Sequence, residues 1–388
     1  MFDLKSVKES KNWSHFTEKD TFNKNEIQGY ICHQQGQDYG SLLIEKVNGE
    51  EVLQAIHATP KLQYPFDKHQ RYQWPKAKII NRYEKLDGTN VLAYSYTDSK
   101  SNLFVSYKTR LKPFLTASRF GDFLSLWKEM LQKYPDIKKL KKLGTTYSFE
   151  LYGNRNPHLI KYAVPLETKL LFSRIGGQVL PSSLTDLGSL VIPTAAFKGS
   201  IDRDYVYNYE NAQKEIDLAL VRTKDGEQFE GEEGEVWYLQ NVDETWTMFK
   251  MKPETIEIIH WSQGSLNLNV IRATIENAYE SMDEPTLEHV NQLLSEEFDE
   301  RVVSQFSEKT GQLLDVSLTR KKLKVEIIEY YKSLGVSILA DKAAVMRAVG
   351  AMFGSKRVPH LDGGKKSLST ISFLYNTIQD YVSNVSTV

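Results

Sequence analysis

The sequence contains little cysteine, no long apolar run and no excess of positive charge. Cys32 is the only cysteine among 388 residues, which excludes an internal disulfide and a metal site built from several thiolates. No run of about 18 apolar residues occurs, so we expect neither a transmembrane helix nor a membrane partner. The stretch from Met1 to Asp20 is polar and lacks the apolar segment of a signal peptide. We therefore expect a cytoplasmic protein.

The charge balance and the histidines argue against two further classes of protein. Lys and Arg total 49, and Asp and Glu total 50, which gives a formal net charge of -1. A protein that coats nucleic acid is usually basic, so any contact with nucleic acid must depend on a local groove. The 8 histidines do not form the His-Glu-x-x-His pattern of a zinc hydrolase.

The pattern of apolar residues changes near Pro253. Before it, short β-branched and aromatic segments predict strands, and one helix is expected around residues 120–134. After it, amphipathic stretches predict helices over residues 270–282, 285–298, 302–314, 323–334, 339–353 and 367–385. We therefore expect an α+β domain with antiparallel sheets over residues 1–254, followed by an all-helical domain over residues 255–388.

The first candidate catalytic segment is residues 84–90, EKLDGTN. It lies between two predicted strands, so Lys85 is expected on a turn at the end of a strand. Gly88 permits a tight turn and a close approach of the backbone to a ligand. A lysine with a neutral amine can attack phosphorus, and neighbouring cations or a metal can lower its pKa sufficiently. The same pattern is also typical of an ordinary solvated turn.

Three further segments place charges where they need an explanation. Glu150 lies inside an apolar and aromatic strand, where a buried charge requires a ligand hydroxyl or a cation. The acidic cluster 230–235, which includes Glu233, could hold a divalent cation through one or two carboxylates. Lys250 and Lys252 are two positions apart, so in a strand both project from one face, towards one phosphate. Each segment alone is also consistent with ordinary surface charge.

Together and in this order, the four segments resemble the motifs of the covalent nucleotidyltransferase superfamily of ligases and capping enzymes. The resembling residues are Lys85-x-Asp87-Gly88, Phe149-Glu150-x-x-Gly153, Glu233-Gly234-x-Val236 and Phe249-Lys250-x-Lys252.

The phage-type RNA ligase 1 family is the most similar branch. Residues 149–162, FELYGNRNPHLIKY, resemble that family's stretch, with Asn156 inside it and Tyr162 closing it. Residues 169–174 and 60–66 resemble two neighbouring segments, and the likeness covers roughly residues 25–255. It departs at Tyr39-Gly40, where the family has an Arg-Gly pair, so an arginine contact to ATP is missing or is supplied elsewhere.

The resemblance implies an adenylyltransferase domain and an ATP-dependent RNA ligase. Lys85 would attack the α-phosphorus of ATP and become lysyl-AMP, the AMP would move to an RNA 5′-phosphate, and a 3′-hydroxyl would then displace it. The expected substrate is RNA with 5′-phosphate and 3′-hydroxyl ends, in RNA or tRNA repair, and a separate enzyme would heal the ends. The expected cofactors are ATP and Mg²⁺ or Mn²⁺.

The resemblance also implies roles for individual residues. Asp87 would orient the nucleophile. Lys250 and Lys252 would hold the α-phosphate and depress the pKa of Lys85. Glu150 would accept a hydrogen bond from the ribose. The remaining contacts with nucleotide and metal would come from Gly88, Lys61 (phosphates), Glu233 (metal), either Lys108 or Arg110 (phosphates) and either Phe172 or Tyr152 (adenine).

Two alternatives remain. A DNA ligase or a GTP-using capping enzyme usually appends a β-barrel after the last motif, and the helical continuation here disfavours both. A catalytically silent RNA-binding protein on the same fold is the other alternative, and the intact motif residues disfavour it. The helical domain would select the RNA, with candidate contacts at Arg320, Lys321, Lys322, Lys324, Lys356 and Arg357.

Overall fold

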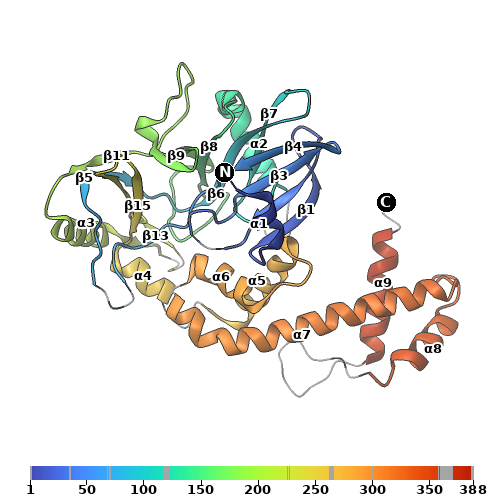
Figure 1. The fold of residues 1–388 in the computed structure, drawn as a ribbon. Coiled ribbons are helices and arrows are strands. Elements are labelled where there is room, and N and C mark those ends of the chain that lie inside the picture. The colour runs from blue at the N-terminus through green and yellow to red at the C-terminus, as the bar shows by residue number, and fades with distance from the viewer. Residues whose placement is uncertain are drawn as a thin grey trace. The chain divides into compact units, whose positions relative to one another are not determined.

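The chain divides into two units, residues 1–258 and 259–388. The computed structural model describes residues 2–34, 36–67, 69, 71–116, 122–224, 226, 228–261, 266–298, 300–356, 358 and 370–385. The fold is α+β, with antiparallel sheets in the first unit and helices in the second (Figure 1).

Among the described residues, the first unit contains three antiparallel sheets of four or five strands and one two-stranded pair. The first contains β1 (Trp13–Lys19), β2 (Glu26–Cys32), β3 (Leu42–Val47) and β4 (Glu50–Ile56) in that order. The second has the order β10 (Gln178–Pro181), β9 (Glu167–Ile175), β8 (Thr145–Tyr152), β6 (Thr89–Thr97) and β7 (Leu103–Lys108). The third has the order β11 (Phe197–Ile201), β5 (Ala77–Glu84), β14 (Glu235–Asn241) and β15 (Trp246–Met251). A short pair, β12 (Val221–Arg222) and β13 (Phe229–Glu230), stands apart.

The second sheet, which contains β8 and β6, is covered by a different element on each face. Helix α2 (Phe123–Lys133) packs Trp127 and Met130 against Phe149 and Leu151 of β8. Its N-terminus is capped by the side chain of Asp122, which accepts a hydrogen bond from the Ser125 N–H. The β1–β4 sheet packs on the alternate residues of β6. Every residue of β8 is therefore buried.

The third sheet has its own cover. Helix α3 (Tyr205–Ala219) packs Tyr209 and Ile216 against Trp237 of β14. The sheet's other face meets β9 and β10, where Phe172 and Val179 contact Tyr83, Val236 and Tyr238. Short helix α1 (Leu4–Glu9) precedes β1, and α4 (Glu254–Trp261) follows β15. The sheet that contains β5, β14 and β15 is thus fixed on both sides.

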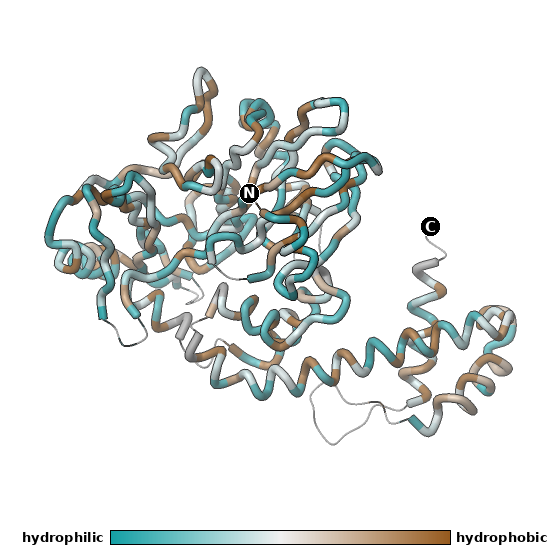
Figure 2. Tube along the Cα trace, in the orientation of Figure 1, coloured by the Kyte–Doolittle hydropathy of each residue, from teal (hydrophilic) through white to brown (hydrophobic). Residues whose placement is uncertain are grey.

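The second unit consists of helices α5 (Leu268–Ser281), α6 (Leu287–Glu297), α7 (Glu300–Ser333), α8 (Lys342–Phe353) and α9 (Thr370–Val385). The two helices expected over 302–314 and 323–334 are one, because residues 315–322 contain no proline or glycine and continue the helix. One half of α7 packs with α5 and α6, and the other half with α8 and α9. Apolar and hydrophilic residues accordingly intersperse along it (Figure 2). None of the helices within the described ranges is long and apolar enough to cross a membrane.

Candidate active site

The ends of three neighbouring strands meet at the turn that contains Lys85. In the antiparallel register, Glu84 at the end of β5 lies opposite Glu235 at the start of β14, and Glu235 lies opposite Met251 at the end of β15. The Lys85 N–H extends this pairing by donating to the carbonyl oxygen of Gly234 at 2.9 Å. Because paired strand ends lie at one edge of a sheet, the residues just beyond them come together.

Glu233 lies between two lysines at this edge. Its Oε2 is 2.5 Å from Lys85 Nζ, and its Oε1 is 2.7 Å from Lys252 Nζ. The Glu233 side chain is only 3% exposed. Burial raises its pKa, but the charges of Lys252 and Lys85 outweigh burial and lower the pKa of Glu233 to about 2. The carboxylate is therefore ionised at any physiological pH.

The pKa of Lys85 is raised in the structure, whereas a lowered pKa was expected from the sequence. Burial favours the neutral amine, but the charge of Glu233 and its hydrogen bond outweigh burial, so the pKa of Lys85 is raised. Asp87 and Glu150 add to the rise. The expected depression by neighbouring lysines is wrong for this state, because the group that directly contacts the Lys85 amine is an anion.

Lys250 is the lysine whose pKa is depressed. Burial lowers the pKa of Lys250 to about 7, and the positive charges of Lys252, Lys85 and Lys61 contribute. The Lys250 N–H donates to the carbonyl oxygen of Gln63 at 2.9 Å, which draws the segment containing Lys61 alongside β15. The Lys250 ammonium also lies 4.3 Å from the ring centroid of Tyr64. Four lysines are thus electrostatically coupled at this edge.

Glu150 approaches the same place from β8. It lies opposite Asn90, at the start of β6 and five residues after Lys85, and is 9% exposed. Burial raises the pKa of Glu150 to about 8 against the lowering by Lys85, and Glu233 and Asp87 add to the rise. The carboxyl group is therefore largely protonated at neutral pH and has an O–H to donate.

The turn itself is packed against β8. A Cβ on Gly88 would lie 2.3 Å from the carbonyl oxygen of Leu151, so the close backbone approach expected at Gly88 is to a strand. The Asp87 carboxylate accepts the Ile160 N–H at 2.8 Å, and the Asp87 N–H donates to the Tyr162 hydroxyl at 2.7 Å. Burial and the charge of Glu233 raise the pKa of Asp87.

The structure distinguishes Lys108 from Arg110. Lys108 is 1% exposed, and its Nζ donates to the carbonyl oxygens of Gly40, Thr109 and Arg110 at 2.9, 2.8 and 2.7 Å. A lysine side chain has at most three donors, and burial lowers the pKa of Lys108 well below the ordinary value. The structure therefore argues against Lys108 as the phosphate contact, and the choice of Arg110 stays a prediction. The Arg110 guanidinium lies 5.3 Å from the ring centroid of Tyr39. Tyr39 occupies the position where the resembling family has an arginine.

The acidic cluster 230–235 has three separate uses. Glu235 accepts two hydrogen bonds from Arg82, at 2.8 and 2.7 Å, and one from the Trp237 indole at 2.8 Å. Glu232 pairs with Lys198, Glu230 is exposed at the end of β13, and Glu233 lies at the site. No group of three or more His, Cys, Asp or Glu that could hold a metal occurs among the described residues. Glu233 fits a magnesium ion only if phosphate and water oxygens complete the shell, which is how that ion is commonly bound.

Both aromatic candidates for adenine are covered by protein. Phe172 is 3% exposed and packs with Val236 and Tyr83. Tyr152 is 6% exposed, and its ring centroid lies 4.7 Å from that of Tyr162. These contacts account for both rings as core residues, so a stacking role for either remains a prediction.

Sequence reasoning missed Tyr64 and understated Gly234. Gly234 has φ +148°, and a Cβ there would lie 2.0 Å from the carbonyl oxygen of Met251, so only glycine fits this approach. Gly234 directly precedes a predicted strand, and this position was the signal in the sequence that could have indicated its role. No local signal marks Tyr64, because a long-range contact with β15 brings it under Lys250.

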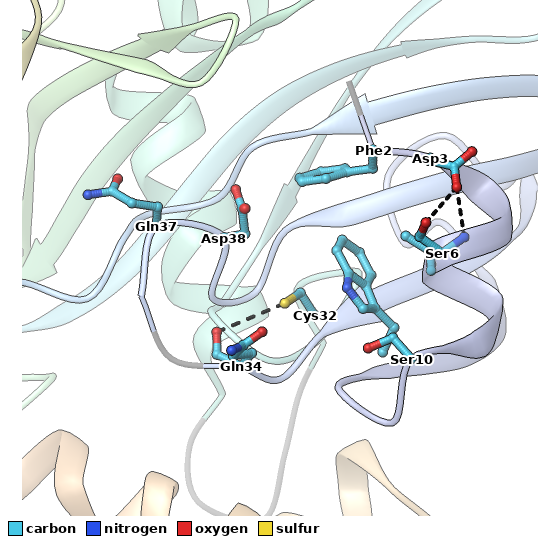
Figure 3. A pocket seen from close by; sticks show the side chains of 10 residues that line it. Phe2, Asp3, Ser6, Ser10, Cys32, Gln34, Gln37 and Asp38 are labelled. Carbon is cyan, nitrogen blue, oxygen red and sulfur yellow. Dashed lines mark hydrogen bonds between the residues drawn. The ribbon is translucent and has the colours of Figure 1, made fainter.

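A separate cavity of about 470 Å³ lies between α1 and the loop after β2 (Figure 3). Its lining includes Phe2, Trp13, Cys32, Gln37 and Asp38. None of the predicted site residues lines it, and its lining contains no lysine or arginine. The cavity is therefore distinct from the lysine cluster and unsuited to a polyphosphate.

Comparison with known proteins gives distant likenesses only. No protein-family model and no curated protein matches the sequence. An archaeal ATP-dependent RNA ligase, form 2, is 12% identical with a TM-score of 0.44 over 98% of this chain and 94% of that chain. A putative ATP-dependent DNA ligase from Aquifex aeolicus is 12% identical with a TM-score of 0.38, over 78% of this chain and 71% of that chain. A Naegleria gruberi RNA ligase with PPi is 9% identical with a TM-score of 0.32, over 63% of this chain and 97% of that chain. Likenesses this distant leave function to be argued from the site.

Proposed function

We propose that the chain is an ATP-dependent RNA ligase that joins 5′-phosphate and 3′-hydroxyl ends through lysyl-AMP and RNA-adenylate. The observation that supports this most directly is the meeting of Lys85 with Lys250, Lys252 and Glu233 at one edge of a sheet. These residues come from the segments whose order resembles the nucleotidyltransferase motifs. RNA repair, including that of tRNA, with a separate end-healing enzyme is the proposed setting.

The lysine cluster suits a polyphosphate. The positive charges of Lys61, Lys85 and Lys252 all lower the pKa of Lys250. The ionised Glu233 carboxylate contacts two of these lysines, Lys85 and Lys252. Burial is the larger cause of the depressed pKa of Lys250, and the positive charge of the other three lysines adds to it. A bound triphosphate would supply the missing negative charge, raise the pKa of Lys250 and draw its proton from solvent. ATP binding should therefore be accompanied by proton uptake near neutral pH.

The amine of Lys85 must lose its proton before it attacks phosphorus. A divalent cation held by Glu233 would neutralise phosphate charge. Glu233 is the residue that would hold such a cation, and a Glu233 carboxylate engaged with it would raise the pKa of Lys85 less. Burial, together with Lys250 and Lys252, then favours the neutral amine. The ion pair with Glu233 thus keeps the Lys85 amine protonated.

Three displacements complete the reaction. The Lys85 nitrogen bonds to the α-phosphorus of ATP, the bond to pyrophosphate breaks, and the amine proton leaves to solvent. An RNA 5′-phosphate oxygen then bonds to the AMP phosphorus, the P–N bond to Lys85 breaks, and the amine regains its proton from solvent. Finally, the oxygen of a 3′-hydroxyl bonds to the RNA 5′-phosphorus, its proton goes to solvent, and the bond from that phosphorus to AMP breaks. Lys250 and Lys252 neutralise the phosphoryl oxygens, Asp87 holds the turn, and protonated Glu150 can donate to a ribose oxygen.

The proposed function is tested by incubating the protein with α-labelled ATP and Mg²⁺, followed by denaturing electrophoresis. We expect the label to remain on the wild-type chain, and to be absent with α-labelled GTP or with Lys85→Ala. Label that survives in Lys85→Ala would show that Lys85 is not the nucleophile. An unlabelled wild-type chain that still binds RNA would instead identify a silent RNA-binding protein. Sealing of nicked RNA compared with nicked DNA then decides the substrate.

A further inference from the structure

Hydrogen bonds from other segments hold the turn that contains Lys85 at three points. The Lys85 N–H donates to the carbonyl oxygen of Gly234 at 2.9 Å. Two residues later, the Asp87 N–H donates to the Tyr162 hydroxyl at 2.7 Å, and the Asp87 carboxylate accepts the Ile160 N–H at 2.8 Å. The peptide unit before Lys85 and the one that joins Leu86 to Asp87 are therefore both held.

The segment 159–162 also contacts the stretch that leads to Glu233. The Phe229 N–H donates to the carbonyl oxygen of Leu159 at 2.9 Å, and the Lys161 N–H donates to the carbonyl oxygen of Phe229 at 2.8 Å. Phe229 lies four residues before Glu233 in the sequence. One segment thus joins the two stretches that supply the two members of the Lys85–Glu233 ion pair.

The Tyr162 side chain is itself held in place. Its ring centroid lies 4.7 Å from that of Tyr152, at an interplanar angle of 59°. Burial raises the pKa of the Tyr162 hydroxyl, and the charges of Asp87, Glu233 and Glu150 add to the rise. The hydroxyl therefore stays protonated at neutral pH and lies near all three carboxyl groups of the site.

We propose that Tyr162 is a positioning residue for Lys85: by accepting the Asp87 N–H, its hydroxyl fixes the turn and thereby the direction of the Lys85 amine. The attack on phosphorus that this serves rests on the proposed function, whereas the placement of the amine is a property of the chain alone. Tyr162 acts through the backbone, so ATP affinity, which depends on lysines of other segments, does not depend on it.

The first test compares Tyr162→Phe with Tyr94→Phe. Tyr162→Phe keeps the ring and removes only the hydroxyl. Tyr94→Phe is a control that removes a different buried hydroxyl, one that donates to the Pro113 carbonyl oxygen at 2.9 Å. In single-turnover adenylation at saturating ATP, Tyr162→Phe should be about tenfold slower, because the Asp87 N–H loses its acceptor. The ATP concentration at half-maximal rate should stay near wild type, and Tyr94→Phe should change neither value.

The second test needs no ATP. An amine-selective reagent should label Lys85 slowly in the wild-type protein, because Glu233 holds its ammonium, and markedly faster in Tyr162→Phe. Tyr94→Phe should label at the wild-type rate, and peptide mass spectrometry measures each site. Unchanged Lys85 labelling in Tyr162→Phe would overturn the proposal, as would an unchanged maximal adenylation rate. If the wild type takes up no AMP but labelling still increases in Tyr162→Phe, the proposed function is wrong and the positioning role stands.

Discussion

At the scale of single residues, the site depends on charges that are placed out of water and paired. Glu233 is 3% exposed, and its two lysine partners, Lys85 and Lys252, are 17% and 13% exposed. Removing one member of such a group leaves a buried charge without compensation, which costs more than the intact pair contributes. Glu233 is therefore expected to matter for stability as well as for catalysis.

Glu233→Gln should destabilise the first unit by roughly 3 kcal/mol at pH 7, at the lower end for a broken buried pair, because solvent partly reaches the lysines. The pKa of Glu233 is depressed to about 2 in the folded chain, against about 4.3 when unfolded. Its contribution is therefore complete above about pH 5 and declines as the pH falls towards 2. The raised pKa of Lys85 acts at the other end, where stability declines only as the pH rises above the usual lysine range.

Urea unfolding followed by tryptophan fluorescence measures this difference, since Trp127 and Trp237 are buried in the first unit. The gap between wild type and Glu233→Gln should shrink from pH 7 to pH 3.5. A gap of equal size at both pH values would show that the Glu233 charge does not stabilise the fold. The same variant should lose adenylation, because both the metal contact and the control over Lys85 are gone.

At the scale of elements, the site exists because backbones approach one another without side chains between them. Gly88 lies against β8 and Gly234 against β15, and in each case a Cβ would meet a carbonyl oxygen within 2.3 Å. The strand ends can therefore close around Lys85. Glycine at these positions serves packing, a role that a sequence pattern alone does not separate from ligand binding.

Gly88→Ala tests this packing role. The added methyl group must push the turn away from β8, which should destabilise the chain by about 1–3 kcal/mol and slow adenylation. Gly350→Ala in α8 is the matched control, because no described atom lies within 4 Å of its Cβ. That change should stabilise by about 0.5–1 kcal/mol through helix propensity. Thermal unfolding of both variants provides the measurement, and a tolerated Gly88→Ala would contradict the role assigned to β8.

The positions of strands and candidate lysines could be predicted from the sequence. Which strands pair, and which groups surround each lysine, could not. Alternating apolar residues identify strands such as β5 and β14, whereas their pairing joins segments more than 150 residues apart. The contact of Gln63 with β15, which places Tyr64 under Lys250, is equally non-local. Lys108 and Arg110 look alike in sequence and differ because three carbonyl oxygens surround only Lys108.

At the scale of the whole molecule, the proposed ATP site lies in one unit and the cations proposed to contact RNA lie in the other. Within the second unit, Arg320 lies 4.7 Å from the ring centroid of Phe373. The Lys321 ammonium donates to the carbonyl oxygen of Asp283 at 2.9 Å. Both cations are engaged internally, whereas Lys322 and Lys324 are exposed. Lys356 pairs with Glu326 at 2.5 Å, and Arg357 lies outside the described residues.

The double variant Lys322→Glu/Lys324→Glu therefore tests whether the helical unit selects RNA. Lys322 forms an exposed ion pair with Glu284, at 3.2 Å. Such pairs contribute little stability, so the fold should survive the change. A plot of the logarithm of RNA affinity against the logarithm of salt concentration has a negative slope. Loss of two phosphate contacts should make this slope shallower by roughly 1.5 to 2. Sealing should fall about tenfold at moderate salt, while lysyl-AMP formation stays near wild type because its residues lie in the other unit.

Lys309→Glu/Arg347→Glu makes the same change of net charge in the same unit and serves as the control. Adenylation and sealing are measured side by side on all three proteins. If sealing falls only in the Lys322/Lys324 variant, those lysines address RNA directly, because the total charge of the unit is matched. If sealing and adenylation fall together, or if neither falls, the helical unit does not select the substrate through these residues. An equal loss of sealing in the control variant would point to the overall field of the unit, since long-range attraction depends on net charge more than on position.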